Sequence, residues 1–219
     1  MKNNFHFVFD LDDTLYKEID FVKSAYEIIN KYLINNYNID IKRNINYCLK
    51  KKINLFDNIS RLKEISDTNF DLQTFLKLYR YQMPSIKIDP SALSFLESLK
   101  NFNSLPSLIT DGRSITQRNK IRAMGISNNF KNILISEEVG YSKTNTFSFE
   151  KIMSLFPDSN FIYVGDNTQK DFLVPNKLGW ETCCLIDDGR NIHMQDFELK
   201  KEYLPKHKIN NILELDRFF

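Results

Sequence analysis

The sequence contains few residues of the kind that form covalent cross-links or soft-metal sites. It has three cysteines, of which Cys183 and Cys184 are adjacent and Cys48 lies far from both. This odd, uneven set excludes a disulfide framework, and no C-x-x-C pair is present to bind zinc. The three histidines are widely separated, so a histidine metal site is not expected either. These absences predict a reduced, cytoplasmic protein.

Long apolar runs and a strong net charge are also missing. No segment approaches the roughly 20 apolar residues that span a bilayer, and the run at residues 5–9 is too short for a secretory signal. With 30 basic and 28 acidic residues, the net charge of +2 makes no electrostatic case for binding nucleic acid or a membrane surface. The basic run at residues 50–52 is interpreted as a solvated helix face, since no aromatic stacking platform accompanies it.

Glycine and proline are absent between residues 17 and 82. In this block the apolar residues recur at intervals of three and four, beginning with Ile19, Val22 and Tyr26, which is the period of a helix that faces a core. No sustained alternation of apolar and polar residues interrupts it. The block is therefore predicted to be helical, and Asp89 with Pro90 is predicted to start a new helix after it.

The rest of the chain alternates between short apolar runs and helical patterns. This alternation predicts a Rossmann-like α/β fold, a parallel sheet covered by helices on both faces. Because the helical block follows the first strand, we expect a core of residues 1–15 and 89–219 and an inserted all-α cap of residues 16–88. The predicted strands are 5–9, 105–110, 132–135, 161–164 and 182–186, and the predicted helices between them are 114–124, 146–156 and 168–178.

Acidic residues follow directly on the first predicted strand, in the stretch FHFVFDLDDTLY at residues 5–16. Two unit charges about 5 Å apart repel by roughly 3 kcal/mol at an effective dielectric constant near 20, so this crowding needs a compensating partner. Ligands of open parallel sheets bind beyond the carboxyl ends of the strands. Polar residues stand at these ends in the other predicted strands as well, at 110–112 and 165–167, and Lys143 and Asp171 lie in the loops nearby.

Four motifs in this order resemble those of the haloacid dehalogenase-like hydrolase superfamily. They are DLDDT at 10–14, ITDG at 109–112, the lone Lys143 and GDNTQKD at 165–171. The resemblance covers the whole chain, including a helical cap between the first and second motifs. It implies an enzyme that transfers a phosphoryl group to one of its own aspartates.

By this resemblance Asp10 is the nucleophile, and Asp12 protonates the leaving oxygen and then deprotonates the attacking water. Members that expel halide need no such proton donor, so Asp12 favours phosphate esters. The implied cofactor is Mg²⁺, held by the Asp10 carboxylate, the Asp12 backbone carbonyl and Asp166. Lys143 is expected to balance the charge on Asp10 and on the transferring group.

Further residues are implied in binding and support. The Thr110 hydroxyl and the amides that follow it, in the Asp111–Gly112 turn at a helix amino terminus, are suited to phosphoryl oxygens. Asp171 is expected to fix either a metal-bound water or the lysine, and Thr14 to support the loop. For Asp13 we expect a position facing solvent or a neighbouring backbone amide.

The function predicted is a Mg²⁺-dependent phosphatase of a small phosphorylated metabolite. A phosphosugar mutase uses the same aspartate pair, although mutases usually have glycine where Asp13 stands. A catalytically silent binding protein is a further alternative. A phosphoryl-receiver module is less suited to this sequence, because its acceptor would have to be Asp57, which lies in a helical pattern. Sugar phosphates, nucleotides and glycolate-type acids all stay open as substrates, as does the oligomeric state.

Overall fold

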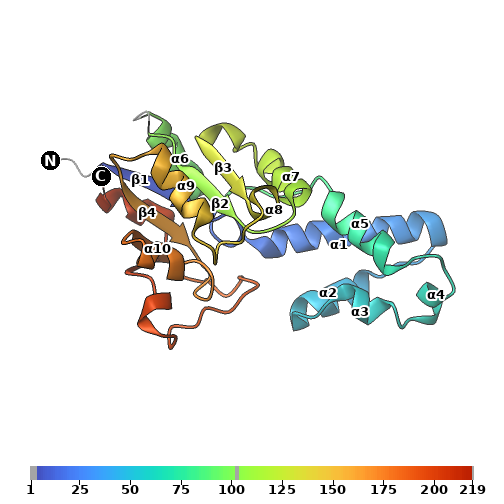
Figure 1. Ribbon diagram of the computed structural model, residues 1–219. Coiled ribbons are helices and arrows are strands. Elements are labelled where there is room, and N and C mark those ends of the chain that lie inside the picture. The colour runs from blue at the N-terminus through green and yellow to red at the C-terminus, as the bar shows by residue number, and fades with distance from the viewer. Residues whose placement is uncertain (1–3, 102–103, 219) are drawn as a thin grey trace.

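The computed structural model describes residues 4–101 and 104–218, so residues 1–3, 102–103 and 219 of the predicted core lie outside the described part. Within it, six parallel strands form a sheet in the order β3-β2-β1-β4-β5-β6 (Figure 1). This order, with β1 inside the sheet and later strands added on both sides, confirms the predicted Rossmann-like fold. The strands are β1 (Phe5–Phe9), β2 (Ser107–Thr110), β3 (Asn132–Ile135), β4 (Asn160–Gly165), β5 (Glu181–Leu185) and β6 (His207–Ile209).

The predicted strands agree with the observed ones to within two residues at either end. The run 105–110 begins too early, because Pro106 has no N–H for a ladder and β2 starts after it. Strand β6 was not predicted. It has three residues, one of them the exposed Lys208, and it follows a long polar segment, so neither its length nor its pattern marks a strand.

Side chains of β1 alternate between the two faces of the sheet, as the pleat requires. Phe7 and Phe9 pack with helix α6 (Pro90–Asn101), with α7 (Ser114–Met124) and with the 3₁₀ helix η3 (Ile212–Phe218). Val8 points to the opposite face and packs with α9 (Phe147–Leu155) and α10 (Leu173–Lys177). The sheet is therefore covered on both faces, which explains why its strands read as continuous apolar runs.

Helix α7 has the predicted bounds, and Gly125 ends it with a φ of 71°, in the left-handed region that favours glycine. The predicted helix 168–178 is too long, since α10 starts only at Leu173. The turn before it is held by the Asp171 carboxylate, which accepts the backbone amides of Asp166 and Asn167. Pro175 is tolerated because it lies in the first turn of α10, where an N–H has no partner within the helix.

Helices α1 to α5 fill the predicted cap and stand beside the α/β body (Figure 1). They bury an apolar cluster of their own, to which α1 contributes Ala25, Ile29 and Leu33. Among the described residues no helix is long and apolar enough to cross a bilayer. The helices are α1 (Glu18–Tyr37), α2 (Lys42–Lys51), α3 (Leu55–Ile59), α4 (Lys63–Ser66) and α5 (Leu72–Tyr81). The short elements of the body are α8 (Ser136–Val139), η1 (Ser127–Asn129) and η2 (Lys201–Tyr203).

Two connections join the cap to the body, and they lie side by side. The backbone amide of Asp89, on the return connection, donates to the carbonyl of Leu15, on the outgoing one, at 2.8 Å. Helix α7 also touches the cap, where the Asn119 amide group donates to the carbonyl of Gln82 at 2.9 Å. The division into a core of 1–15 and 89–219 and a cap of 16–88 stays a proposal.

Replacing Leu96 in α6 with alanine tests the core of the body. Leu96 is fully buried, so Leu96→Ala is expected to lower the free energy of unfolding by about 2–5 kcal/mol, from lost burial and a residual cavity. Leu155→Ala is the matched control, because Leu155 is 50% exposed, and its cost is expected to stay below about 1 kcal/mol. Urea unfolding measures both. Equal losses for the two variants would contradict the assignment of α6 to the core.

Candidate active site

Polar side chains meet at the carboxyl edge of the sheet, where β1, β2 and β4 end. They surround a cavity of about 110 Å³. All four motifs identified in the sequence contribute to its lining, although they are separated by up to about 150 residues of chain. The lining residues are Asp10, Asp12, Asp13, Glu18, Thr110, Asp111, Lys143, Asp166, Asn167, Lys170 and His193.

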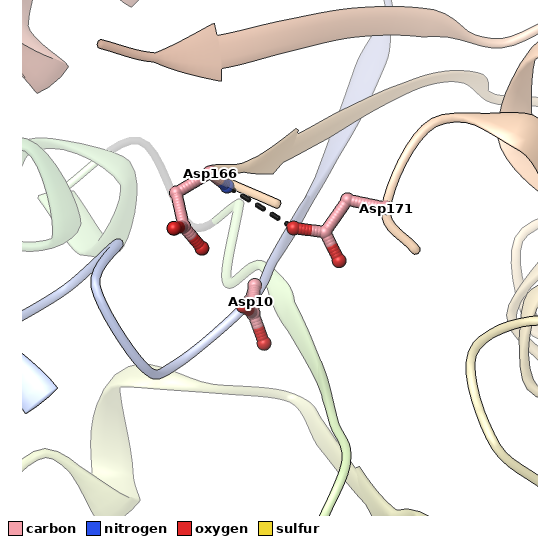
Figure 2. Close-up of side chains that lie close together, drawn as sticks. All are labelled: Asp10, Asp166 and Asp171. Atoms are coloured by element: carbon pink, nitrogen blue, oxygen red, sulfur yellow. Dashed lines mark hydrogen bonds between the residues drawn. The ribbon is translucent and has the colours of Figure 1, made fainter. Parts of the chain in front are cut away.

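Asp10, Asp166 and Asp171 form an acidic cluster, and Asp10 and Asp166 line this cavity. One carboxylate oxygen from each lies within 4.8 Å of one from each of the others, and all three side chains are buried. Figure 2 shows the three carboxylates converging from the end of β1 and from the loop after β4. Three buried acids this close are strongly destabilising unless cations compensate them.

Lys143 supplies one positive charge. Its ammonium nitrogen lies 2.9 Å from Asp10 Oδ1 and 2.6 Å from Asp171 Oδ1, and the side chain is 5% exposed. Burial alone would lower the pKa of Lys143, but the two carboxylates raise it well above its ordinary value, so the lysine is charged. The Lys143 backbone amide donates to Asp111 Oδ1 at 2.9 Å, so in this structure Asp111 holds the lysine loop.

Asp171 binds both the lysine of the cluster and the backbone after β4. Its Oδ2 accepts the backbone amides of Asp166 at 3.1 Å and Asn167 at 2.8 Å, and its Oδ1 accepts the lysine. The carboxylate also occupies the space beside Gly165, where an added Cβ would lie 2.5 Å from Asp171 Oδ2. A glycine is therefore required there, and the bonds of Asp171 correspond to the predicted alternative in which it fixes the lysine.

Asp12 lies in a separate set of contacts. Its Oδ1 accepts the Tyr16 hydroxyl and lies 2.7 Å from the Lys120 ammonium, and its Oδ2 accepts the Gln117 amide group at 2.8 Å. Burial raises the pKa of Asp12, but Lys120 and the hydrogen bonds outweigh it, so the pKa lies below its ordinary value. Lys120 is 3% exposed and also faces Glu18 of α1 at 3.8 Å. Asp12 is thus held in its ionised form at the contact between core and cap.

Thr110 shares one of these partners. The Gln117 amide group, which binds Asp12, also donates to Thr110 Oγ1 at 2.7 Å. The backbone amide of Gly112 donates to the Ser136 hydroxyl at 2.9 Å, so it is occupied within the protein. Gly112 has a φ of 147°, and an added Cβ would lie 3.1 Å from the Gln117 side chain. The loop therefore lies against Gln117, and one of the amides predicted to bind phosphate is engaged by Ser136.

The two remaining polar residues of the first motif, Asp13 and Thr14, are buried. Asp13 has a φ of 54°, in the left-handed region, and accepts the backbone amides of Glu18 at 2.8 Å and Ile192 at 2.9 Å. This is the second of the two positions expected for it. Thr14 is 1% exposed, and its hydroxyl has no hydrogen-bond partner among the described residues. Its contribution to the loop is therefore packing, with no polar contact of its own.

The charge balance shows which ligand fits this site. Burial raises the pKa of Asp10 to about 8, opposed by Lys143 and assisted by Asp171. Burial likewise raises the pKa of Asp166 to about 9, and the charges of Asp171 and Asp10 add to it. The cluster thus lacks positive charge, and it offers hard oxygen donors within 4.8 Å of one another. A small divalent cation such as Mg²⁺ fits both properties.

Gln117 and Lys120 lie outside the four motifs and were not predicted as site residues, although both contact Asp12. A signal for them was present, since they are three residues apart on a helix that starts just after the second motif, and so they share one face. Asn191 was missed as well. Its amide group donates to Asp166 Oδ2 at 2.9 Å, and no spacing within the sequence relates a position 25 residues further along the chain to that carboxylate.

The chain is similar to several known proteins. The sequence profile of a family described as haloacid dehalogenase-like hydrolase matches residues 7–185, which include all four motifs. A glyceraldehyde 3-phosphate phosphatase of Methanocaldococcus jannaschii is 28% identical over 95% of this chain and 93% of its own length. The pyrimidine 5′-nucleotidase YjjG of Escherichia coli is 30% identical over 58% of this chain and 55% of its own. A magnesium-bound structure of the HAD-hydrolase YfnB from Bacillus subtilis has the same fold, with a TM-score of 0.63, 18% identity and coverage of 99% and 98%.

The raised pKa values predict how Mg²⁺ stabilises the protein at different pH. A carboxyl whose pKa rises on folding stabilises fully below its unfolded value and loses this contribution as pH rises through the folded value. For Asp10 and Asp166 the loss runs from about pH 4 to the folded values of about 8 and 9. With EDTA, their contribution to the melting temperature should therefore fall over this window. Mg²⁺ should add more stability near pH 8.5 than near pH 5.5, because it displaces fewer protons there.

Calorimetric melting curves with EDTA and with Mg²⁺ measure this difference. Asp166→Asn is expected to reduce the Mg²⁺ increment strongly at both pH values. Asp158→Asn, in an exposed loop, should leave the increment unchanged. A Mg²⁺ increment that does not depend on pH would contradict the charge balance described for the site.

Proposed function

The chain belongs to the haloacid dehalogenase-like hydrolase family and is an enzyme of the phosphatase kind, and from this premise we propose a Mg²⁺-dependent phosphohydrolase that cleaves a small phosphomonoester through an aspartyl-phosphate on Asp10. The observation that carries the proposal is the convergence of Asp10, Asp166 and Lys143 on one cavity, with Asp171 buried against them. A structural ion-pair cluster would need about as many cations as acids. This cluster has three acids and one lysine.

In the proposed reaction the Asp10 carboxylate attacks phosphorus, forming an O–P bond while the ester O–P bond breaks. Because Asp12 is ionised at rest, it first takes up a proton, from solvent or from the water of the preceding turnover, and then gives this proton to the departing oxygen as the alcohol leaves. The Asp12 carboxylate then takes a proton from water, whose oxygen attacks phosphorus and releases inorganic phosphate and Asp10. Contact with Lys120 favours the ionised form of Asp12, which is the form that the second half of the reaction uses.

The proposed cation ligands are the carboxylates of Asp10 and Asp166 and the backbone carbonyl of Asp12. Two oxygens suit this role, because no hydrogen bond among the described residues reaches Asp10 Oδ2 or Asp166 Oδ1. When bound, Mg²⁺ neutralises the carboxylates and the phosphoryl group that meet there. Asp171 supports the arrangement, and Lys143 balances the charge on Asp10 and on the transferring group.

The proposed phosphate contacts are the Thr110 hydroxyl and the Asp111–Gly112 turn. Thr110 lines the cavity that Asp10 lines, which supports the assignment. The Gly112 amide would have to leave the Ser136 hydroxyl to bind a phosphoryl oxygen. Thr110 and the Asp111 backbone are therefore better placed than Gly112 in this arrangement.

A second cavity of about 520 Å³ would receive the remainder of the substrate. It lies between α1, α2 and residues 189–193, and it shares Glu18 and His193 with the cavity of the carboxylates. Its volume falls within the range of small-molecule sites. The names of the relatives, a glyceraldehyde 3-phosphate phosphatase and a pyrimidine 5′-nucleotidase, support a small phosphorylated metabolite as substrate.

A phosphosugar mutase of the same family is the second candidate, since it would use the same Asp10 and Asp12. Product analysis separates the two reactions. A phosphatase releases one inorganic phosphate for each substrate consumed, whereas a mutase rearranges the phosphate and releases none. Assaying about a hundred phosphorylated metabolites for released phosphate in the presence of Mg²⁺ would also identify the substrate. A catalytically silent protein would convert none of them.

Replacing the nucleophile is the direct test of the proposal. Asp10→Asn removes the attacking oxygen and should lower kcat for an aryl phosphate by at least about 1,000-fold. Circular dichroism should show an intact fold, because the substitution also relieves repulsion among buried acids. The control Asp158→Asn should keep full activity. Substantial turnover by Asp10→Asn would mean that another group attacks phosphorus.

Replacing Asp12 tests the acid–base assignment. Asp12→Asn keeps the nucleophile, so an aryl phosphate with a good leaving group should still phosphorylate Asp10, since this leaving group needs no proton. Hydrolysis of the intermediate should then become slow. We expect a burst of one aryl alcohol per enzyme followed by slow turnover, and acid-quenched mass spectrometry should detect the phosphorylated protein. Slow turnover with neither burst nor adduct would remove Asp12 from its proposed role.

A further inference from the structure

The segment that follows β5 reaches from the carboxyl end of this strand to the cap. We name residues 187–193 the strap (Figure 1, the orange segment between β5 and the 3₁₀ helix η2). Within it Asp188, Gly189 and Arg190 are exposed, but Asn191 is only 1% exposed. A buried polar side chain that follows three exposed residues requires hydrogen-bond partners that compensate for its desolvation.

The Asn191 side chain has two such partners, and its backbone has one more. Its amide group donates to Asp166 Oδ2 at 2.9 Å, and its Oδ1 accepts the Lys17 ammonium at 2.7 Å. Its backbone carbonyl accepts the Lys52 ammonium at 3.2 Å. Lys17 directly precedes α1, and Lys52 directly follows α2. One residue therefore connects a carboxylate of the acidic cluster to two helices of the cap.

Hydrogen bonds fix the strap on both sides of Asn191. The Asp187 carboxylate accepts the backbone amides of Gly189 at 2.8 Å and Asn191 at 2.9 Å, which holds the turn before Asn191. On the other side, the Ile192 amide donates to Asp13, next to the acid–base residue, and the Ile192 side chain packs against the apolar cluster of the cap. The position of Asn191 thus depends on the body and on the cap together.

The contact with Asn191 determines how Asp166 presents its oxygens. Oδ2 accepts the amide group, and Oδ1 is the Asp166 oxygen that no hydrogen bond among the described residues engages, so Oδ1 is left for a cation. An asparagine side chain suits this position, since it donates to a carboxylate at one atom and accepts an ammonium at the other. Leucine has nearly the same size and can do neither.

We propose that Asn191 is a positioning residue that orients Asp166 for the divalent cation and couples cation binding to the position of the cap relative to the body. The inference rests on the proposed function for the presence of that cation. Orienting partners of metal ligands typically contribute 10- to 100-fold to metal affinity. Since linkage is reciprocal, a bound cation must also stabilise the contacts of the strap with Lys17 and Lys52.

The affinity test uses Mn²⁺, whose free ion is counted by electron paramagnetic resonance, and needs no substrate. Asn191→Leu should bind Mn²⁺ about 10- to 100-fold more weakly than the parent protein. The double variant Lys17→Met/Lys52→Met keeps the contact of Asn191 with Asp166 but removes its ties to the cap, and it should bind about 5-fold more weakly. The control Asn36→Leu, on the exposed face of α1, should bind like the parent.

Hydrogen exchange supplies a second readout. Mg²⁺ should slow amide exchange in the strap and at the start of α1 in the parent protein, and this protection should disappear in Asn191→Leu. A purely structural role of Asn191 would instead change exchange equally with and without the ion.

The outcomes separate this inference from the function on which it rests. If the parent protein binds no Mn²⁺, the metal site itself is wrong, and the inference falls with it. If the parent binds Mn²⁺ and Asn191→Leu binds it equally well, the inference is overturned while the proposed function stands. Should Asn191→Leu fail to fold, unchanged affinity in the double lysine variant still overturns the link between cation and cap.

Discussion

Repulsion among buried carboxylates is the constraint on which the site depends. Asp10 lies far in the chain from Asp166 and Asp171, and the sheet brings the oxygens of all three within 4.8 Å of one another beside a single lysine. Such an arrangement costs free energy of folding unless positive charge is added. The features around it reduce that cost in part: Lys143 bridges two of the acids, and two backbone amides bind Asp171. A divalent cation would supply the remainder.

Two aspartates of the first motif, only two residues apart, lie in different environments. Asp10 faces the acidic cluster, which raises its pKa, whereas Asp12 turns toward Lys120 and Gln117, which lower it. Environments that drive the pKa values of two acids apart are typical of sites where the acids have different roles. Lys120 and Gln117, which lower the pKa of Asp12, lie on α7. This helix also contacts the cap through Asn119. Asp12 is therefore positioned by the same helix that touches the cap.

Much of this arrangement could be predicted from local patterns. Strands β1 to β5 and α7 follow from apolar periodicity and from Gly125, and the order of the four motifs predicts that Asp10, Asp166 and Lys143 lie at one edge of the sheet. What the sequence did not reveal depends on contacts between distant segments. Strand β6 forms by pairing with β5, and a turn brings Asn191 back to Asp166. Neither leaves a periodic signal in the sequence, because β6 pairs with β5 and Asn191 binds Asp166, and both partners lie elsewhere in the chain.

The account as a whole depends on a cation at the centre of the acidic cluster. The most direct measurement is an anomalous difference map from a crystal of the protein soaked in Mn²⁺. We expect one strong peak within coordination distance of the Asp10 and Asp166 carboxylates, with Asp171 still bound to Lys143. A map without a peak there, or with Lys143 alone filling the space between the carboxylates while Mn²⁺ binds at another place, would contradict the account.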